Sequence, residues 1–261
     1  MNQPLAYVNP EAKVADNVVI EPFAAIDKDV IIDEGTWIGS NVTIMRGARI
    51  GKNCKIFPGS VISAIPQDLK FKGEYTTVHI GDNTTIREFV TINRGTIASN
   101  KTVIGKNCLL MAYVHIAHDC VIGDNCIIAN TTSLAGHITV GDWAIIGGLS
   151  GVHQFVNIGA HVMISGGSLI RKDVPPFTKA AREPLAYVGV NSIGLRRRGF
   201  TSEQITNIQD IYRILFLRGR NVTQAVAYIE ANIPATKERD IILSFINQKS
   251  DRGLMKGYSK F

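Results

Sequence analysis

A large aliphatic residue recurs at every sixth position through the first two thirds of the chain. The register begins at Val8, ends at Ile170 and is broken only at Asp68, Glu74 and Ala98. The position four residues after each aliphatic residue is usually small or β-branched. A fixed period of six matches neither the period of about 3.6 of a helix nor the period of about two of a strand. It predicts a solenoid of stacked repeats.

Each six-residue unit is predicted to form a short strand followed by a turn. The large aliphatic side chain points into the axis of the solenoid, and the small residue fits beside the next corner. One unit cannot bury its own apolar face, so the units must stack. Three units make a coil of eighteen residues, and successive coils lie about 4.8 Å apart. We therefore predict a mainly β protein, a parallel β-helix of hexapeptide repeats.

Two polar stretches interrupt the repeat, and we predict that both are loops projecting from the solenoid. They lie near residues 63–79 and 94–103, and the first carries Asp68 and Lys70. Inert insertions are the alternative. Binding groups on a rigid scaffold often lie on such loops, which favours a function for the first loop and leaves the second undecided. The predicted domains are the β-helix at 1–175, a connector at 176–200 and an α-helical C-terminal domain at 201–261.

The period changes from six to a helical one in this C-terminal domain. Thr201 and Gln204 have the spacing of a capping box at the start of a helix. The predicted buried stripe of that helix consists of Ile205, Ile208, Ile211, Leu215 and Leu217. Thr223 is predicted to cap a second helix, and a third is expected at roughly 237–248.

The formal net charge of the 261-residue chain is +6, which favours anionic partners. Basic residues cluster only at 196–198 and in a thin tail at 249–260, without the aromatic platforms or module typical of nucleic-acid binding. No apolar run reaches the roughly 18–20 residues that span a bilayer, and the N-terminus lacks a signal-like pattern. We expect a cytoplasmic protein with no nucleic-acid partner and no transmembrane segment.

All four cysteines occupy the small inward position of the repeat: Cys54, Cys108, Cys120 and Cys126. We therefore predict buried packing residues rather than a disulfide set or a metal site. Reduced thiols agree with a cytoplasmic location.

Four of the six histidines fall within one unbroken stretch of the repeat, namely His115, His118, His137 and His153. The eighteen-residue coil predicts which side chains stack on neighbouring coils. His118, Gly136 and Gln154 are spaced by eighteen and should share one line. Asp119 and His137 should share the line beside it.

This combination of side chains suits acyl transfer to a hydroxyl. His118 can act as a general base, because histidine titrates near neutral pH. Asp119 can hold its tautomer and stabilise the imidazolium, and the backbone N–H of Gly136 can stabilise an oxyanion. No serine or cysteine is placed as an obvious nucleophile, so direct transfer is favoured over an acyl-enzyme.

Two other interpretations of the histidines stay open. One is that they are turn residues without a role, as we expect for His79 and His161, which have no chemical neighbours in the sequence. The other is a zinc site, because imidazole is a common zinc ligand. Against zinc, His115 and His118 share a turn and Asp119 is placed to orient a base, so no metal is expected.

Six segments carry a specific resemblance to one enzyme family: His115–Cys120, Leu134–His137, Val152–Phe155, Gln67–Lys70, Gly189–Asn191 and Leu195–Phe200. Over essentially its whole length, the chain resembles the acyl-[acyl-carrier-protein]–UDP-N-acetylglucosamine O-acyltransferases of lipid A biosynthesis. The resemblance implies transfer of a (3R)-3-hydroxyacyl chain from acyl carrier protein to the glucosamine 3-OH of UDP-N-acetylglucosamine, without a cofactor. It also implies a left-handed winding and a homotrimer with active sites between neighbouring solenoids.

The resemblance also implies roles for individual residues. The catalytic positions are matched by His118 as the base, Asp119 as its partner and Gly136 at the oxyanion. The positions that hold the sugar and acyl portions are matched by Asp68, Lys70, His115, His137 and Gln154. The nucleotide and phosphate positions are matched by Asn191, Arg197 and Arg198. The acyl-chain groove is matched by His153, and the position that limits chain length by Gly166, where a glycine leaves room for a long chain.

The chain departs from the family pattern at two positions. Asn93 stands where the family often has a histidine, and Ile193 stands where a glutamate near the uridine is common. An asparagine can still form hydrogen bonds and an isoleucine cannot, so the nucleotide contacts are expected to differ here.

Three alternatives to this function stay open. A related N-acyltransferase of the same pathway carries a uridine-binding domain before its solenoid, and the repeats here begin at Val8, which leaves no room for one. A zinc hydratase of related fold predicts stoichiometric zinc at the histidines. A pure scaffold predicts that nothing depends on His118. The sequence predicts neither the acyl-chain length nor whether the sugar carries a hydroxyl or an amine at position 3.

Overall fold

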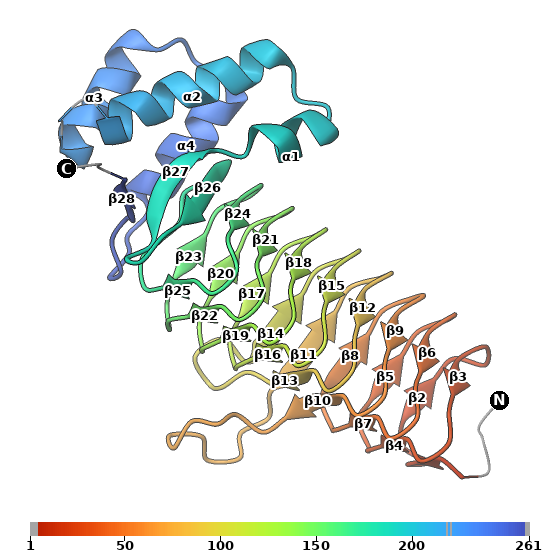
Figure 1. Ribbon diagram of the computed structural model, residues 1–261. Helices are drawn as coiled ribbons and strands as arrows, with labels where there is room; N and C mark the ends of the chain where they lie inside the picture. Colours follow the sequence, from red (N-terminus) through yellow and green to blue (C-terminus); the bar gives the residue numbers. More distant parts are fainter. Residues whose placement is uncertain (1–4, 218, 220, 259–261) are drawn as a thin grey trace.

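The chain forms a left-handed parallel β-helix followed by a short antiparallel strand pair and a group of helices (Figure 1). The computed structural model describes residues 5–217, 219 and 221–258. The helices lie beyond one end of the solenoid, and the N-terminal coils lie at the other end. The predicted fold class is therefore confirmed.

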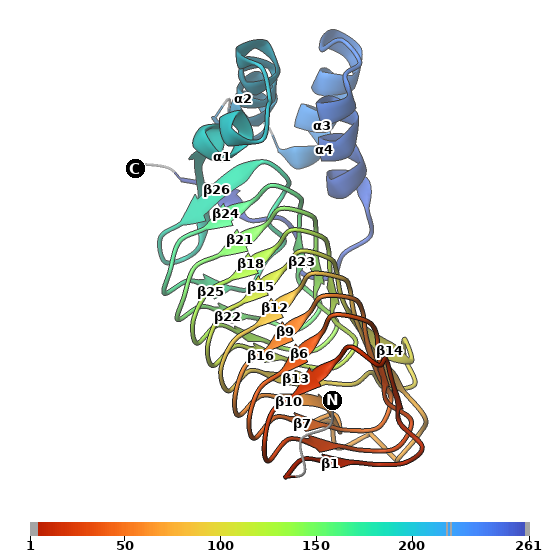
Figure 2. The same ribbon diagram turned by 90° about the vertical axis from the view of Figure 1, so that its right-hand side faces the viewer.

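Three sheets form the sides of a triangular coil, and Figure 2 shows the stacked coils obliquely from the N-terminal end. The nine-stranded sheet contains β1 (Tyr7–Val8), β4 (Ala25–Ile26), β7 (Thr43–Ile44), β10 (Val61–Ala64), β13 (Thr91–Asn93), β16 (His115–Ile116), β19 (Ser133–Leu134), β22 (Gly151–Val152) and β25 (Leu169–Ile170). The eight-stranded sheet contains β2 (Lys13–Val14), β5 (Ile31–Ile32), β8 (Ala48–Ile50), β11 (Thr77–Ile80), β14 (Lys101–Ile104), β17 (Val121–Ile122), β20 (Thr139–Val140) and β23 (Asn157–Ile158). The eleven-stranded sheet contains β3 (Val19–Ile20), β6 (Trp37–Ile38), β9 (Lys55–Ile56), β12 (Thr85–Ile86), β15 (Leu109–Leu110), β18 (Ile127–Ile128), β21 (Ile145–Ile146), β24 (Met163–Ile164), β26 (Thr178–Ala181), β27 (Ala186–Val190) and β28 (Lys256–Gly257).

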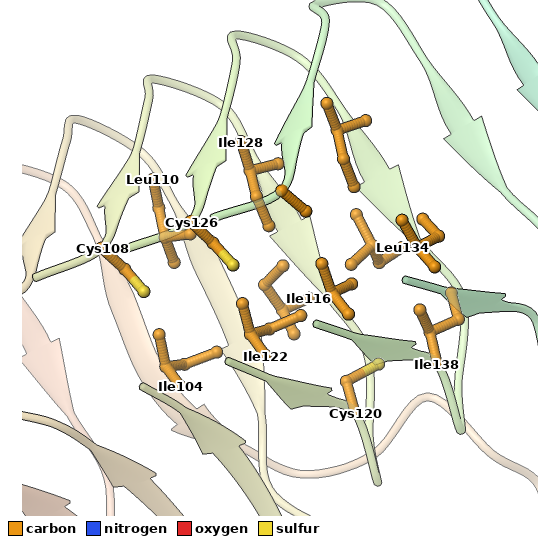
Figure 3. Packing of buried hydrophobic residues seen from close by; sticks show 14 of the residues in the cluster. Ile104, Cys108, Leu110, Ile116, Cys120, Ile122, Cys126, Ile128, Leu134 and Ile138 are labelled. Atoms are coloured by element: carbon orange, nitrogen blue, oxygen red, sulfur yellow. The ribbon is translucent and has the colours of Figure 1, made fainter. Parts of the chain in front are cut away.

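From Ile20 onward, the aliphatic residue of each repeat is buried in the axis of the solenoid, whereas Val8 and Val14 at the N-terminal end are partly buried. These residues pair directly from coil to coil, as Ile116 pairs with Leu134 and Leu134 with Val152. Figure 3 shows such side chains meeting inside the coils. Each fully buried side chain of this size contributes roughly 1.5–3 kcal/mol, so the continuous column holds the stack together.

The cysteines also lie in this core. All four are free and buried, as predicted, and Cys108, Cys120 and Cys126 lie among the aliphatic side chains in Figure 3. Burial raises the pKa of Cys120 to about 12, so its thiol stays protonated and is a poor nucleophile.

The chain turns at three edges, which we name by a residue of each. The His118 edge joins the nine-stranded to the eight-stranded sheet, the His161 edge joins the eight-stranded to the eleven-stranded sheet, and the Gly166 edge closes the coil. Turn residues such as Asp119 and His137 have a positive φ of 60° and 61°. This left-handed conformation allows the sharp corner between two strands.

Both predicted loops project from the His118 edge, and the first extends beside β10 in Figure 1. They occupy 65–76 and 94–100, slightly less than predicted, because the flanking strands extend into them. Ile62 pairs with Ile92 and Ile92 with Ile116, at separations of 30 and 24 residues in place of 18. Each insertion is therefore a multiple of six, and the register resumes after it.

The predicted connector at 176–200 contains regular structure that the sequence analysis missed. β26 continues the eleven-stranded sheet in parallel beside β24, and β27 returns antiparallel to it. The helix α1 (Ser192–Arg197) follows. A single strand pair and one short helix have no repeating period that would reveal them.

The first long helix, α2 (Ser202–Leu217), begins as predicted. The N–H of Gln204 donates to the hydroxyl of Thr201 (3.2 Å), and the N–H of Thr201 donates to Oε1 of Gln204 (2.9 Å). The predicted stripe is buried at Ile205, Ile208, Ile211 and Leu215. The side chain of Leu217 lies outside the described residues.

The predicted cap of the second helix is wrong. Asn221, not Thr223, caps α3 (Val222–Asn232), because its side chain accepts from the N–H of Gln224 in a reciprocal capping box. The helix α4 (Lys237–Asn247) lies where the third was expected. Residues 259–261 of the predicted domain lie outside the described residues. No described helix is long and apolar enough to cross a membrane.

Candidate functional site

The stack predicted on the His118 edge is present. The N–H of His137 donates to the carbonyl of His118 (3.1 Å), and the N–H of Phe155 donates to the carbonyl of Gly136 (3.2 Å). The rings of His118 and His137 meet edge to face with centroids 5.0 Å apart, and the ring of Phe155 stacks on His137 at 4.6 Å. Three successive coils therefore place three rings in one row.

His118 is nearly buried, and one of its ring nitrogens faces a carboxylate. Its Nδ1 lies 2.8 Å from Oδ2 of Asp119. Because the carboxylate accepts a hydrogen bond there, Nδ1 carries the proton of the neutral ring and Nε2 is left with its lone pair. This is the tautomer that a general base requires.

The carboxylate of Asp119 is buried and is held by the second loop. The N–H of Thr96 donates to Oδ1 (2.9 Å), its hydroxyl donates to Oδ2 (2.7 Å), and the hydroxyl of Ser99 donates to Oδ1. Burial acts to raise the pKa of Asp119, but the bonds from Ser99, Thr96 and His118 outweigh it and lower the pKa to about 2. Asp119 is therefore ionised at neutral pH.

Gly136 lies one coil beyond His118, against its ring. A Cβ at this position would lie 2.5 Å from Cε1 and 2.8 Å from Nε2 of His118, closer than real side chains approach. Within the described residues, the N–H of Gly136 makes no backbone hydrogen bond. An unpaired N–H beside the base is the arrangement that stabilises a developing oxyanion.

The tip of the first loop lies near His137. Burial lowers the pKa of His137, and the charges of Asp119, His118, Asp68 and Lys70 act on it in opposing directions. Such charge effects require the loop to come close to the ring, because they fall off with distance. The charges of Asp68 and Lys70 on the first loop therefore act on the ring of His137.

Contacts at the far side of the first loop hold it in place. The hydroxyl of Tyr75 donates to Oδ2 of Asp29 (3.0 Å), which lies on the turn between β4 and β5. The carboxylate of Glu74 accepts from the N–H of Ile97 (3.3 Å), which joins the first loop to the second. The two loops therefore form one connected structure beside the row.

The two departures from the family pattern differ in burial. Asn93 is buried at the root of the first loop, and its Nδ2 donates to the carbonyl of Ile65 (3.1 Å). Its Oδ1 has no hydrogen-bond partner among the described residues. Ile193 is exposed in α1. Asn93 therefore forms a hydrogen bond, as expected, whereas Ile193 presents only an apolar side chain to solvent.

A groove of about 560 Å³ lies on the outer face of the nine-stranded sheet next to the His118 edge. Its lining residues are His115, Ser133, Leu134, Ala135, Gly151, Val152, His153, Gln154, Leu169, Ile170 and Arg171. The predicted residues His115, His153 and Gln154 therefore share one mostly apolar groove. Nδ1 of His115 lies 2.7 Å from the hydroxyl of Thr91, and burial lowers the pKa of this histidine.

Gly166 lies on the next edge and does not line this groove. A Cβ there would lie 3.1 Å from the carbonyl oxygen of Gly148. The structure thus places the predicted length-limiting residue near, but not within, the groove on the nine-stranded sheet.

The predicted nucleotide contacts gather on the His161 edge. Asn191 caps α1, and its Nδ2 donates to the carbonyl of His161 (2.9 Å). Nη1 of Arg198 lies 3.4 Å from Nδ1 of His161, and its guanidinium lies 5.1 Å from the ring centre of Trp143. Arg197 is exposed in the last turn of α1.

His161 belongs to this second cluster, although the sequence analysis assigned it only a structural place. Its ring stacks between Trp143 (6.4 Å) and Phe177 (5.5 Å). Burial first, and then the charge of Arg198, lowers its pKa to about 4. The eighteen-residue step from Trp143 to His161 was a signal that could have been used.

The His118 and His161 edges bound opposite sides of the eight-stranded sheet. One chain therefore does not bring Arg198 or Asn191 to His118. The predicted catalytic and nucleotide residues form two separate clusters. A ligand that contacts both clusters has to lie between two chains.

Three ligand atoms in the row could in principle hold a metal ion. Those of His118, Asp119 and His137 lie within 4.8 Å of one another. However, both oxygens of Asp119 already accept hydrogen bonds from the second loop, and Nδ1 of His118 carries its proton toward them. The donor set suits a base with its carboxylate better than a metal centre.

Comparisons with known proteins identify the family of the chain. The family model described as Udp N-acetylglucosamine O-acyltransferase, domain 2, matches residues 173–255, and hexapeptide-transferase repeats match 29–64 and 101–136. An acyl-[acyl-carrier-protein]–UDP-N-acetylglucosamine O-acyltransferase of Sulfurihydrogenibium sp. is 58% identical over 98% of this chain and 95% of its own. The one of Thermodesulfovibrio yellowstonii is 45% identical over 96% and 97%.

Solved structures show the same relationship. A UDP-N-acetylglucosamine acyltransferase from Bacteroides fragilis superposes with a TM-score of 0.96 at 52% identity, covering 98% of this chain and all of its own. The enzyme from Francisella novicida has a TM-score of 0.95 at 39% identity, over 98% and 94% of the two chains. The chain is therefore an acyltransferase and belongs to the acyl-[acyl-carrier-protein]–UDP-N-acetylglucosamine O-acyltransferase family.

Proposed function

We propose that this enzyme transfers a (3R)-3-hydroxyacyl chain from acyl carrier protein to the 3-OH of UDP-N-acetylglucosamine, the first step of lipid A biosynthesis. One observation carries the proposal. The buried His118–Asp119 pair lies against Gly136, whose N–H has no backbone partner within the described residues. The names of the relatives supply the donor and the acceptor.

The reaction is a direct transfer with His118 as the general base. Nε2 removes the proton from the sugar hydroxyl while that oxygen attacks the thioester carbonyl of the donor. The N–H of Gly136 stabilises the negative oxygen of the tetrahedral intermediate, and Asp119 stabilises the imidazolium. The C–S bond then breaks, and the leaving sulfur takes the proton from His118.

The architecture supports direct transfer over an acyl-enzyme. The four cysteines are buried in the axis of the solenoid, and the thiol of Cys120 has a pKa raised to about 12. A thiol that is both buried and protonated does not attack a thioester at neutral pH. We infer that the attacking group is the hydroxyl of the acceptor itself.

The remaining predicted residues are assigned to substrate binding. The sugar and the proximal part of the acyl chain are held by Asp68, Lys70, His115, His137 and Gln154. The acyl chain continues past His153, and Gly166 limits its length. The apolar groove beside the row supports the assignment of His115, His153 and Gln154, because a hydrocarbon chain is stabilised when it leaves water for an apolar surface.

The nucleotide is held by the neighbouring chain of a homotrimer. Asn191 and Arg198 lie on the His161 edge, with Arg197 next to Arg198 in sequence, and His118 lies on another edge. One substrate can therefore contact both groups only between two chains. The guanidinium groups of Arg197 and Arg198 suit the diphosphate. We propose a cytoplasmic place of action, which the free thiols and the carrier-protein donor support.

The test is an assay of the purified enzyme with UDP-N-acetylglucosamine and 3-hydroxyacyl carrier proteins of graded chain length. Mass spectrometry should detect the 3-O-acylated sugar nucleotide, with a maximum at one chain length. An acceptor with a free amine in place of the 3-OH is included to distinguish O- from N-transfer. Absence of transfer at every chain length would refute the proposed function.

A further inference from the structure

Two cations lie where the His118 edge reaches the end of the solenoid. Lys172 continues the line of His118, Gly136 and Gln154 by one more step of eighteen residues. Arg252 comes from the C-terminal segment, which returns to this edge after the helices. Neither residue has a part in the mechanism described above.

The backbone around Arg252 is firmly held. The N–H of Asp173 donates to the carbonyl of Gly253 (2.9 Å), and the N–H of Met255 donates to the carbonyl of Asp173 (2.9 Å). Nζ of Lys172 donates to the carbonyl of Arg252 (3.4 Å). These bonds fix the C-terminal segment beside the last coil and bring the two cationic residues together.

The guanidinium of Arg252 adds a fourth group to the row of rings. Its Cζ lies 5.8 Å from the ring centre of Phe155, and the ring of Phe155 stacks on His137. The row thus runs from His118 through His137 and Phe155 to Arg252. The arginine faces the same edge as the catalytic base.

Within the described residues, the charges of Lys172 and Arg252 have no counter-ion. Nε of Arg252 is buried without a hydrogen-bond partner, and neither Arg252 nor Lys172 forms an ion pair with a carboxylate in the described part of the chain. The nearest carboxylate in sequence, that of Asp173, accepts from the N–H of Asn157 (2.8 Å). A buried guanidinium N–H without a partner is costly, and an anion would satisfy it.

We propose that Lys172 and Arg252 bind the phosphodiester of the phosphopantetheine arm that carries the acyl group. This inference rests on the proposed function. It adds a phosphate-binding site on the donor side, separate from the nucleotide cluster on the His161 edge.

The distance along the edge distinguishes the donor phosphate from the diphosphate of the acceptor. Phe155 lies two coils beyond His118, so about 10 Å separate them, and Arg252 lies 5.8 Å further. About thirteen bonds join the phosphorus of the arm to its sulfur, which spans about 15 Å when extended. Only about five bonds join the nearer phosphorus of the acceptor to its 3-oxygen, or about 6 Å. The donor phosphate fits the distance.

The test compares three 3-hydroxyacyl donors: the acyl carrier protein, the acyl-phosphopantetheine and the acyl-pantetheine that lacks the phosphate. The variants are Lys172→Gln, Arg252→Gln and their combination. Arg182→Gln is the matched control, since Arg182 is an exposed arginine of the same region whose guanidinium lies 4.9 Å from the ring of Tyr258.

We expect kcat/KM of the double variant to fall about 10- to 100-fold with both phosphate-bearing donors. With the acyl-pantetheine donor, the double variant should have the same kcat/KM as the wild type. The control Arg182→Gln should have the wild-type kcat/KM with every donor. Arg252→Lys should retain most of the activity. The thermal stability of each variant is measured alongside its kinetics. Its activity with the phosphate-free donor shows whether the catalytic site itself is intact.

Three results would overturn the inference. An equal loss with the phosphate-free donor would mean that the residues only support the fold. A rise confined to the KM for UDP-N-acetylglucosamine would assign them to the diphosphate of the acceptor. Unchanged kinetics of the variants with all donors would show that Lys172 and Arg252 do not bind the phosphate. A wild-type enzyme inactive with every donor would instead refute the proposed function, and this inference with it.

Discussion

Two short contacts determine the chemistry of His118. Oδ2 of Asp119 lies 2.8 Å from Nδ1 of the His118 ring. Gly136 lies so close to the ring that any side chain at this position would collide with it. The sequence could predict both neighbours, because one is adjacent in the chain and the other follows by eighteen residues. It could not predict that the Gly136 backbone touches the ring, since that depends on the rotamer of His118.

A methyl group at position 136 should displace the ring of His118. In Gly136→Ala we expect kcat to fall roughly 100-fold, because a misplacement of about 1 Å has this effect on a reacting group. The KM for UDP-N-acetylglucosamine should change little. Steady-state kinetics and thermal melting measure the two effects separately. Full activity in a folded Gly136→Ala enzyme would show that the ring position seen here is not the reactive one.

The second loop is the element that keeps Asp119 charged. Thr96 and Ser99 donate to both of its oxygens, and the loop lies on the catalytic edge. The loops themselves were predictable, because insertions in multiples of six leave the register intact on both sides. The contacts between them were not, because a loop has no period that places its side chains.

Removal of the Thr96 hydroxyl tests the role of this loop. Thr96→Val should raise the pKa of Asp119, which is about 2 in the native enzyme, and should lower kcat roughly tenfold. A carboxylate with a lowered pKa stabilises the fold above its unfolded pKa of about 3.9, and this stabilisation disappears as the pH falls through about 2. Acid unfolding of Thr96→Val, followed by circular dichroism, should therefore begin at a higher pH.

The conservative variant Thr96→Ser is the control for that experiment. It keeps the hydroxyl that donates to Asp119, so it should retain the kcat and the acid stability of the wild type. If Thr96→Ser lost as much activity and acid stability as Thr96→Val, the hydrogen bond from the Thr96 hydroxyl to Asp119 would not explain the loss.

On the scale of the whole molecule, the structure separates the residues proposed for catalysis from those proposed for nucleotide binding. The repeat predicted the solenoid and the positions along each edge. Its hand and triangular section came from the family resemblance, since a period alone does not define them. The placement of Asn191 and Arg198 on the His161 edge depends on β26, β27 and α1, which carry no periodic signal.

This separation predicts complementation between two inactive variants. In the proposed homotrimer, the His118→Ala and Arg198→Ala variants should each have little activity, because each lacks one half of every site. Unfolding and refolding them together in equal amounts should restore about a quarter of the sites, those in which both neighbours contribute an intact half. The acyltransferase activity of the refolded mixture, compared with that of each variant alone, measures the recovery. No recovery in mixed trimers of normal stability would place both halves of the site on one chain.

The central claim is that His118 is the base of an acyl transfer to UDP-N-acetylglucosamine. The most direct measurement is the turnover number of His118→Ala with 3-hydroxyacyl carrier protein, with His79→Ala as the control, since His79 lies on the eight-stranded sheet away from the row. We predict that kcat of His118→Ala falls about 10²- to 10⁴-fold without loss of folding, while His79→Ala remains active. Near-normal turnover by a folded His118→Ala enzyme would contradict the account.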